Sequence, residues 1–569
     1  MPLAPCIQRF VTSNSAIIRL LCGALALAPV VTVGAAERPG PLPRTTVIDD
    51  YVKREDPSYS WGVVSSTTED GTTSIVVDMV SQQWLTKEDV DLPEWRHWLT
   101  LAVPAKVTSN VGMLFIGGGR NGRDAPKAAG ARFAAIAKAT GSVVAELGTV
   151  PNQPLTFHND GKPRTEDDLI GYTWDQFLKT GEARWLARNA MIKSAVRAMD
   201  TMTAVMATAD AGKRNVDRFV VAGGSKRGWT TWLTGAMDDR VVGIIPIVID
   251  VLNTQVSMQH HFEAYGFWAP SIGNYVEHHI MERLDHPRLA ELYKLVDPYH
   301  YRHRLNMPKL LLNAAGDQFF LPDSSHFYWD ELRGENYLRY IPNTDHGMDG
   351  TDVLDTIVAF QTLIVEGRKP PQFTWKRSGD GKIRILTETD PVAVTLWQAN
   401  NPHARDFRVE TLGRKYTQQA VKPNAEGLYE AHIDTPKDGW TAWFVELTFD
   451  VGAATPLKLT TNVAVAPDVL PFKGKPANLP PSITYVCTPK SDADVLASQV
   501  VAQLEGQPFA ANLHARVHAD RLYLNWTPAA GLYDGAGGVD KQLQAMGCTN
   551  SAWQLESGPD ITLPPVSAR

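Results

Sequence analysis

The stretch that most constrains the fold is Phe219-Val-Val-Ala-Gly-Gly-Ser-Lys-Arg-Gly-Trp-Thr-Thr-Trp232. Its apolar start, Phe219 to Ala222, predicts a short buried strand, and a helix is expected from Lys226 to about Met237. Between them lie Gly223, Gly224 and Ser225. A strand, a tight glycine turn, a serine and a helix in this order are typical of a nucleophile elbow. Such a turn strains the backbone of the serine and presents its hydroxyl at a helix N-terminus, where developing negative charge is favoured.

Apolar strands alternate with helices over most of the remaining chain. Strands are expected at Ser74–Val80, Val111–Ile116, Ser142–Leu147, Val241–Asp250, Lys309–Ala314 and Tyr337–Ile341, and helices at Ala125–Thr140, Ala187–Thr208, Asp323–Arg333 and Thr351–Glu366. This alternation predicts an α/β fold with a doubly wound, mostly parallel sheet that is covered by helices on both faces.

The chain of 569 residues is long enough for roughly three or four domains. We expect a signal peptide at 1–36 and an α/β-hydrolase domain at 37–369, with a helical, His-rich and aromatic lid insertion at about 251–308. After Pro370-Pro371, alternating residues and hairpin signals predict a β-sandwich-like domain at 370–475. Residues 476–569, which hold one helix and one strand candidate, form a small accessory unit.

The N-terminus has the features of a secretory signal. Arg9 and Arg19 precede an apolar run from Leu20 to Val33, and small residues end at Ala36, near the expected cleavage position. A membrane helix is disfavoured because the run is short and contains a proline. A lipoprotein signal is disfavoured because a leucine, not a small residue, precedes Cys22. We therefore expect periplasmic or secreted localisation, with no stable membrane span after cleavage.

Two cysteines remain after the predicted cleavage, Cys487 and Cys548. An even pair in an oxidising compartment favours a disulfide, with two unpaired buried thiols as the alternative. No cysteine spacing of the metal-binding type is present, so no metal site is expected. A net charge of -7 without a long charge run does not favour a nucleic-acid partner.

A serine nucleophile needs a base, a group that orients the base and an oxyanion hole. In a doubly wound hydrolase, the serine, the acid and the histidine come in that order, each after a strand. Asp317 follows the strand predicted at Lys309–Ala314, and His346 follows the strand at Tyr337–Ile341. The order predicts Ser225 as nucleophile, with these two as orienting acid and general base.

Other acids and other interpretations remain open at this stage. Asp250 is the rival acid because it ends the strand after the elbow helix, and Asp345 and Asp349, which flank the histidine, are weaker rivals. Taken singly, each residue has a more common role. A serine among glycines usually forms a turn, an aspartate after a strand usually caps a helix, and a histidine in a loop usually lies on the surface. The combination in order favours the catalytic interpretation.

The oxyanion hole is expected from backbone N–H groups. One donor is Lys226, the residue after the nucleophile, and the other comes from the loop Gly117-Gly118-Gly119-Arg120. The side chains of Lys226 and Arg227 either add positive charge near the substrate or form a solvated first helical turn.

The same glycine loop contains a lone G-x-G-x-x-G, formed by Gly117, Gly119 and Gly122, and Glu146 ends the next strand. This pattern raises a nicotinamide-cofactor site as a rival. In a nicotinamide-cofactor site a helix should start directly after the glycine loop, but Arg123-Asp-Ala-Pro126 stands at that place. A cofactor site would also leave the order of Ser225, Asp317 and His346 unexplained. No cofactor is therefore expected.

Five stretches combine in one pattern. They are Tyr51-Val-x-x-x-Asp56-Pro-Ser-Tyr59, the Trp84 and Trp95-x-x-Trp98 region, Gly117-Gly-Gly-Arg-Asn121, Val150-Pro-Asn-Gln-Pro154 and Gly223-Gly-Ser-Lys-Arg-Gly-Trp229. With these motifs the chain resembles the PhoPQ-activated pathogenicity-related proteins, a bacterial group of α/β-hydrolase type, over roughly residues 45–470. The resemblance implies an exported hydrolase-fold protein with a C-terminal β domain and does not imply a defined substrate.

The elbow differs from the usual lipase and esterase pattern at one position. Arg227 stands where that pattern has glycine, and Gly228 follows one residue later. This version resembles the glucuronoyl esterases, in which the basic residue after the serine assists the oxyanion. The resemblance implies that role for Lys226, and it argues against ordinary lipases and prolyl-type peptidases.

The favoured function is a serine hydrolase that cleaves an ester or amide through an acyl-enzyme, with esterase ahead of peptidase. The substrate is a small molecule, a glycoconjugate or a peptide. Trp229, Trp232 and Trp268 lie in or near the proposed site and could stack on sugar rings, although core packing is the commoner role. The alternative is a non-catalytic binding protein on the same fold.

Overall fold

The fold is described from a computed structural model. It describes residues 45–379, 381–474, 483–490, 492–504, 513–518, 521–526, 543 and 545–555. The predicted signal peptide lies outside the described residues.

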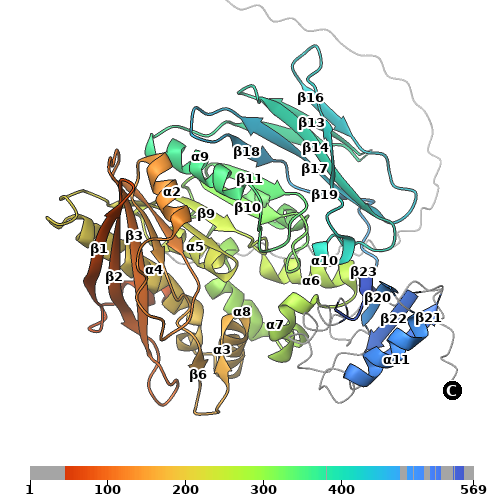
Figure 1. The fold of residues 1–569 in the computed structure, drawn as a ribbon, viewed down its shortest axis with the longest axis horizontal. Coiled ribbons are helices and arrows are strands. Elements are labelled where there is room, and N and C mark those ends of the chain that lie inside the picture. Colours follow the sequence, from red (N-terminus) through yellow and green to blue (C-terminus); the bar gives the residue numbers. More distant parts are fainter. Residues whose placement is uncertain are drawn as a thin grey trace, which may run out of the picture. The chain divides into compact units, whose positions relative to one another are not determined.

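A sheet of nine strands in the described part of the chain forms the centre of the fold (Figure 1). Its strand order is β1-β2-β3-β5-β4-β8-β9-β10-β11. The strands are β1 (Ser60–Glu69), β2 (Thr72–Gln83), β3 (Glu94–Pro104), β4 (Val111–Ile116), β5 (Val144–Leu147), β8 (Arg218–Gly224), β9 (Val241–Ile247), β10 (Lys309–Ala314) and β11 (Asn336–Ile341). The first three strands and the β3–β5 pair are antiparallel, and all pairs from β5 to β11 are parallel. This order, with the elbow strand β8 in the parallel part, is that of an α/β hydrolase.

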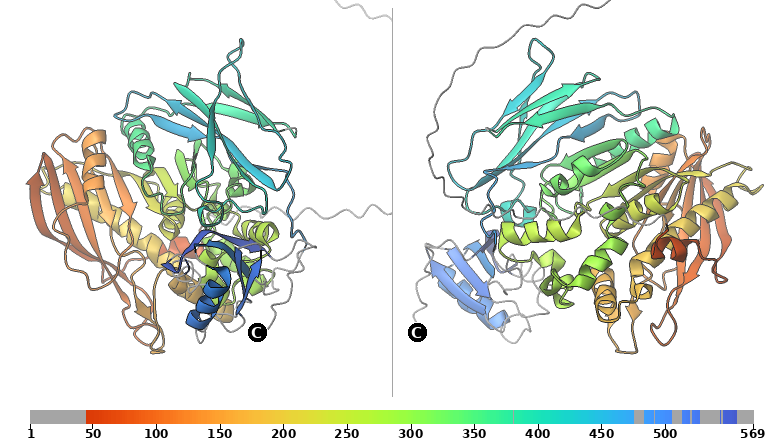
Figure 2. Two further views of the ribbon diagram at one scale, coloured as in Figure 1. Left: turned by 45° about the vertical axis from the view of Figure 1, so that its right-hand side comes forward. Right: turned by 180° about the vertical axis from the view of Figure 1, so that it is seen from behind.

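Helices cover both faces of this sheet (Figures 1 and 2). The described helices are α1 (Val47–Lys53), α2 (Ala131–Thr140), α3 (Glu166–Thr180), α4 (Ala187–Met206), α5 (Lys226–Met237), α6 (Thr254–Tyr265), α7 (Gly273–Glu277), α8 (Pro287–Val296), α9 (Val353–Val365), α10 (Val409–Leu412) and α11 (Ala493–Leu504). Alternate residues of β8 belong to two different apolar cores, Val221 to the core with α4 and α5, and Val220 to the core with α2 and α9. A strand buried on both faces explains why Phe219–Ala222 is continuously apolar.

Several predicted elements match the structure closely, among them the strands Val111–Ile116 and Lys309–Ala314 and the helix after Ser225. The helix predicted at Asp323–Arg333 is wrong: 3-10 turns occupy Ser324–Phe327 and Trp329–Glu331. Tyr328 breaks the α-helical path at φ -145, and its hydroxyl donates a hydrogen bond of 2.6 Å to Asp250. The tertiary contact overrides the local propensity.

Other boundaries shift as well. The helix predicted at Ala125–Thr140 begins only at Ala131, and the strand predicted to reach Asp250 ends at Ile247. Helix α3, which was not predicted, follows a short hairpin of β6 (Leu155–Thr156) and β7 (Pro163–Arg164).

The segment 251–308 is helical, as predicted. It holds α6, α7 and α8 together with short 3-10 turns at Pro270–Ile272, Met281–Arg283 and Pro298–Tyr301. None of the helices in the described part of the chain combines the length and apolar character that crossing a bilayer requires.

Beyond α9 the described chain forms antiparallel sheets. One has the order β12-β13-β16 and the next the order β15-β14-β17-β18, with β19 paired to β17. Their strands are β12 (Phe373–Arg377), β13 (Lys382–Thr387), β14 (Ala393–Asn401), β15 (Thr417–Ala420), β16 (Tyr429–His432), β17 (Trp440–Phe449), β18 (Leu457–Thr460) and β19 (Ala464–Ala466). These antiparallel sheets agree with the β-rich region that is expected after Pro370.

The last sheet has the order β21-β22-β20-β23. Its strands are β20 (Ile483–Pro489), β21 (Leu513–His518), β22 (Arg521–Trp526) and β23 (Cys548–Leu555). Cys487 and Cys548 are joined in a disulfide that links β20 to β23. The alternative of two unpaired thiols is therefore wrong for this structure.

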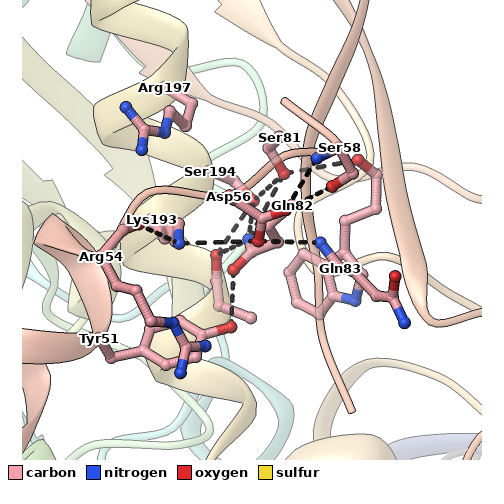
Figure 3. A network of polar contacts seen from close by, with 12 residues as sticks. Tyr51, Arg54, Asp56, Ser58, Ser81, Gln82, Gln83, Lys193, Ser194 and Arg197 are labelled. Atoms are coloured by element: carbon pink, nitrogen blue, oxygen red, sulfur yellow. Dashed lines mark hydrogen bonds and ion pairs between the residues drawn. The ribbon is translucent and has the colours of Figure 1, made fainter. Parts of the chain in front are cut away.

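A buried polar network ties the start of the described chain to α4 and β2 (Figure 3). Lys193, whose side chain is 0% exposed, donates a hydrogen bond of 2.7 Å to the carbonyl oxygen of Arg54. Its Nζ lies 3.7 Å from Oδ2 of Asp56, and the same carboxylate accepts from the backbone N–H of Gln83 and from Ser58. Because a buried cation needs partners, this network has a structural role and anchors the segment that precedes β1.

Candidate active site

Ser225 lies at the sharp turn between β8 and α5. Its backbone has φ 56 and ψ -127, an unfavourable region for a residue with a side chain. Its N–H donates to the carbonyl oxygen of Ile247 at 2.8 Å, and its carbonyl accepts from Trp229 N–H at 3.0 Å. The neighbouring strand and the following helix thus hold the strained conformation, which is the local geometry expected of a nucleophile elbow.

Close backbone approach explains two of the glycines around this turn. A Cβ on Gly223 would lie 2.8 Å from the carbonyl oxygen of Arg227, and a Cβ on Gly228 would lie 2.9 Å from the carbonyl oxygens of Gly223 and Ile247. A Cβ on Gly224 would meet nothing within 4 Å. Gly228, which stands one place later than the glycine of the common pattern, is therefore required because α5 packs closely against β8 and β9.

Substitution at Gly228 is expected to destabilise the protein. Gly228→Ala forces a methyl group against two carbonyl oxygens, and overpacking of this kind costs about 1–3 kcal/mol. Gly224→Ala is the matched control, because the space beside Gly224 is open. Thermal unfolding should show a lowered Tm for the first variant and a Tm close to wild type for the second. Equal Tm values for both variants would contradict the packing argument.

Asp317 and His346 are brought together at the carboxyl ends of β10 and β11. The Nδ1 of His346 lies 2.8 Å from Oδ2 of Asp317. The other carboxylate oxygen accepts from the backbone N–H of Phe319 at 2.7 Å, and the Asp317 residue is 3% exposed. The backbone N–H of His346 donates to Oε1 of Gln318 at 3.1 Å. This arrangement holds the imidazole in one orientation and favours the proton on Nδ1.

Asp250, the rival acid, has other partners. It accepts hydrogen bonds from the hydroxyls of Tyr328, at 2.6 Å, and Tyr340. Burial raises the pKa of Asp250 to about 7, and the nearby Asp317 and Asp323 carboxylates add to this, although the two tyrosine hydrogen bonds act in the opposite direction. Its burial and its two tyrosine partners suit a structural acid better than a partner of the imidazole.

Ser225 and His346 are not hydrogen-bonded in this structure. The Nε2 of His346 is buried and has no hydrogen-bond partner among the described residues. The ring of Phe319 lies against the imidazole, with 4.4 Å between the ring centroids. In proteins without bound substrate, catalytic hydrogen bonds are often long or poorly aligned.

Of the two alternatives for Lys226 and Arg227, the solvated first helical turn is wrong, because their side chains are only 6% and 12% exposed. The Nζ of Lys226 lies 2.8 Å from Oε2 of Glu166 and 3.2 Å from Oδ2 of Asp167. Arg227 donates to both carboxylate oxygens of Glu166, at 2.8 and 2.6 Å. The positive charge beside Ser225 is therefore partly balanced by two carboxylates at the start of α3.

Sequence reasoning missed Glu166 and Asp167. Burial raises the pKa of Glu166, but the hydrogen bond from Arg227 and the charges of Lys226 and Arg227 outweigh this and hold it well below its usual range. The signal in the sequence is Thr165-Glu-Asp-Asp168, because a threonine followed by acids marks a helix N-terminus.

Removing the charge of Glu166 is expected to destabilise the fold. Glu166→Gln leaves two cations with a single carboxylate, and because the Glu166 side chain is 42% exposed the expected loss in the free energy of unfolding is about 1–2 kcal/mol. Folding lowers the pKa of Glu166 from its ordinary value of 4.5. The stability that its carboxylate contributes is therefore fully present above pH 4.5 and is lost as the pH falls towards the pKa of Glu166 in the folded protein. Urea unfolding at pH 7 measures it. Glu182→Gln is the control, because the Glu182–Arg184 pair is about half exposed on both sides, and an equally large loss there would contradict the account.

The glycine loop after β4 lies against Arg227. A Cβ on Gly118 would be 2.8 Å from Nη2 of Arg227, and Gly119 has φ 138, so both positions favour glycine. Arg227 also donates from Nε to the carbonyl oxygen of Val150 at 2.5 Å. Arg227 therefore braces the loop that was predicted to supply an oxyanion donor.

The geometry does not favour a nicotinamide site at this loop. A dinucleotide fingerprint requires the glycine turn to open a helix, whose N-terminus meets the pyrophosphate. Here α2 begins only at Ala131, well beyond Gly122, and Glu146 lies 3.5 Å from Arg132 as an ion pair.

A cavity of about 50 Å³ adjoins Ser225 and Lys226. Its walls include Trp229 of the elbow helix and Phe319, the residue that contacts the imidazole of His346. Trp232 is 1% exposed and is not among the lining residues. Trp268, stacked on His261, is 4% exposed. Trp232 and Trp268 therefore pack in the core, which is the more common role of a buried tryptophan.

A segment between β14 and β15 braces the loops of the acid and the histidine. The N–H of Val409 donates to the carbonyl oxygen of Gly316 at 3.0 Å, and the side chain of Asn343 exchanges two hydrogen bonds with the backbone of Tyr416. The fully buried Arg405 pairs with Asp323 at 2.6 Å. Sequence reasoning assigned this segment to the β-rich region and did not connect it with the site.

The sheet order, the sharp turn at Ser225 between β8 and α5, and the helices on both faces of the sheet define an α/β hydrolase fold. The chain belongs to the PhoPQ-activated pathogenicity-related protein family, whose model matches residues 48–408. This confirms the resemblance predicted from the sequence motifs. The Autocrine proliferation repressor protein A of Dictyostelium discoideum is 36% identical over 461 residues, which are 75% of this chain and 92% of that protein.

Solved structures with a related fold are more distant. Acetyl xylan esterase 1 from Thermoanaerobacterium sp. JW/SL YS485 is 14% identical, with a TM-score of 0.39 over 57% of this chain and 95% of that chain. An acetyl xylan esterase from Paenibacillus sp. R4 is 13% identical, with a TM-score of 0.38 over 57% and 92%. The acylaminoacyl peptidase of Pyrococcus horikoshii is 13% identical, with a TM-score of 0.32 over 55% and 50%. These likenesses are too distant to say anything about the substrate of this chain.

Proposed function

We propose that this protein is an exported serine hydrolase that cleaves an ester or amide through an acyl-enzyme intermediate, with an ester favoured. The observation that carries the proposal is the 2.8 Å contact between His346 Nδ1 and Asp317 Oδ2. Asp317 follows β10 and His346 follows β11, and the sheet order β8-β9-β10-β11 places both loops at the carboxyl ends of the strands, as it does Ser225.

In the proposed reaction, the Ser225 hydroxyl attacks the substrate carbonyl carbon and its proton passes to Nε2 of His346. The C–O or C–N bond to the leaving group then breaks, and the imidazolium returns the proton to that group. Water attacks the acyl-enzyme in the same way and releases the acid. Asp317 stabilises the imidazolium through Nδ1–H.

The negative charge on the carbonyl oxygen is stabilised by backbone N–H groups of Lys226 and of the Gly118–Gly119 loop. The first N–H groups of a helix have no intrahelical partner, so the amide of Lys226 is free of the helix ladder. The ammonium of Lys226 adds positive charge, tempered by Glu166 and Asp167, and Arg227 holds the loop. Substrate binding brings the Ser225 hydroxyl within reach of His346.

Export is supported by the N-terminal charge and hydrophobicity pattern and by the Cys487–Cys548 disulfide, which suits a periplasmic or secreted protein. The partner is a small-molecule, glycoconjugate or peptide substrate. The mature chain is proposed to have no stable membrane span, and nothing in its charge favours nucleic acid.

A second candidate is a non-catalytic binding protein on the hydrolase fold. One observation favours it, the absence of a hydrogen bond to His346 Nε2 from any described residue. The Dictyostelium relative is also named as a repressor of proliferation.

Labelling with a fluorophosphonate probe separates the two candidates. Such probes react with an activated serine hydroxyl, so we expect labelling of the wild-type mature chain and none of Ser225→Ala. Circular dichroism and Tm serve as controls for folding. A folded wild-type protein that takes up no label, or labels equally in both forms, would favour the binding protein.

A further inference from the structure

The cavity beside Ser225 has walls that are mainly aromatic and aliphatic. Most of its lining residues are buried, including Trp229, Ile249 and Met258, whereas Ser225 and Phe319 are only half-buried. Ser225 therefore lies towards its open end. At about 50 Å³ the cavity is small, although it exceeds the minimum of roughly 10–15 Å³ that a single water needs.

Four polar atoms without hydrogen-bond partners among the described residues belong to side chains that line this same cavity. They are Nε1 of Trp174, Nε of Arg188 and the hydroxyls of Thr254 and Tyr293. These residues are 2%, 1%, 4% and 3% exposed, and they come from α3, α4, α6 and α8. Buried polar groups nearly always have a partner, and one left unpaired is destabilising. Four of them around one cavity point to a bound polar group or water that supplies missing partners.

Packing holds two of these side chains in place. The ring of Trp174 packs edge-on against Trp229 and Tyr293, with centroid distances of 5.9 Å in both cases. The guanidinium of Arg188 lies 3.9 Å above the ring of Trp229 and donates from Nη1 to the carbonyl oxygen of Lys226 at 3.2 Å. The donors are therefore preorganised around the cavity.

We propose that this cavity binds the acyl part of the substrate, and that the acyl group is short and carries an oxygen that accepts hydrogen bonds from Trp174 and Tyr293. The inference rests on the proposed function. The acyl part stays bonded to Ser225 while the leaving group departs, so a buried cavity suits the acyl part. The size of the cavity limits the acyl chain, and the unpaired donors select for an acceptor oxygen, neutral or anionic.

Two esters with acyl groups of equal size test the acceptor. p-Nitrophenyl butyrate and p-nitrophenyl methoxyacetate differ by one CH₂ replaced by oxygen. Their kcat/KM ratio is divided by the ratio of their rates with hydroxide, which removes intrinsic reactivity. We expect the wild-type protein to prefer methoxyacetate by about tenfold after this correction, the effect of one good hydrogen bond.

Tyr293→Phe and Trp174→Phe should each lower the corrected preference for methoxyacetate over butyrate, because each variant removes one donor to the acyl oxygen. Because Tyr293→Phe removes an oxygen without a partner, the variant is expected to fold. Tyr301→Phe is the matched control: this buried tyrosine donates to Leu295 and does not line the cavity.

Hydrolysis of both esters at a corrected ratio near one would overturn the acyl-pocket proposal and leave the serine hydrolase standing. A preference that survives both variants would overturn it too. Hydrolysis of neither ester, with Ser225 still labelled by fluorophosphonate, would overturn the pocket alone. The same failure without labelling would overturn the proposed function as well.

Discussion

Ser225→Ala is expected to lower kcat/KM for an activated ester by about 10⁴-fold or more. In the proposed mechanism the hydroxyl is the attacking group, and alanine removes it while leaving the elbow turn between β8 and α5 in place. His346→Ala should cost a similar factor, because the serine is a weak nucleophile without its base. Steady-state hydrolysis of p-nitrophenyl acetate measures both.

The double variant Ser225→Ala/His346→Ala distinguishes a catalytic unit from two independent residues. Members of a catalytic unit are strongly non-additive, so the double variant should be no slower than Ser225→Ala alone. Losses that multiply would show that His346 acts elsewhere. The comparison is meaningful because both residues are half-buried and neither belongs to the apolar cores on the two faces of the sheet.

The second large effect concerns the acid. Asp317→Asn should lower kcat by about 10⁴-fold, because the amide no longer fixes the Nδ1–H tautomer or stabilises the imidazolium. Asp250→Asn is the matched control: this aspartate is equally buried and binds Tyr328 and Tyr340. Its variant should retain kcat within about tenfold, although its Tm is expected to change. A larger loss of kcat in Asp250→Asn would identify Asp250 as the acid of the triad.

Much of the fold follows from patterns within short segments. Phe219–Ala222 is apolar without interruption because it is buried on both faces, and the glycines beside Ser225 reflect a turn that leaves no room for Cβ at two positions. The order of Ser225, Asp317 and His346 follows from parallel strands, whose carboxyl ends meet at one edge. These features depend on local sequence and on topology, so they could be predicted.

Contacts between distant segments could not be predicted in this way. Glu166 lies far from Arg227 in the chain, and their ion pair depends on how α3 meets α5. The 3-10 turns around Tyr328 result from its contact with Asp250, which no local propensity indicates. The brace from Val409 to Gly316 likewise depends on the packing of a β-rich segment against the loops of the site.

The most direct test of the central claim is to trap the acyl-enzyme. The wild-type mature chain is mixed with a p-nitrophenyl ester, quenched in acid within the first turnovers, digested, and mapped by mass spectrometry. The account predicts a mass increase equal to the acyl group on the peptide that contains Ser225, and its accumulation in Asp317→Asn if water attack on the acyl-enzyme is slowed more than its formation. Hydrolysis that proceeds with no acyl group on Ser225, or with the group on another residue, would contradict it.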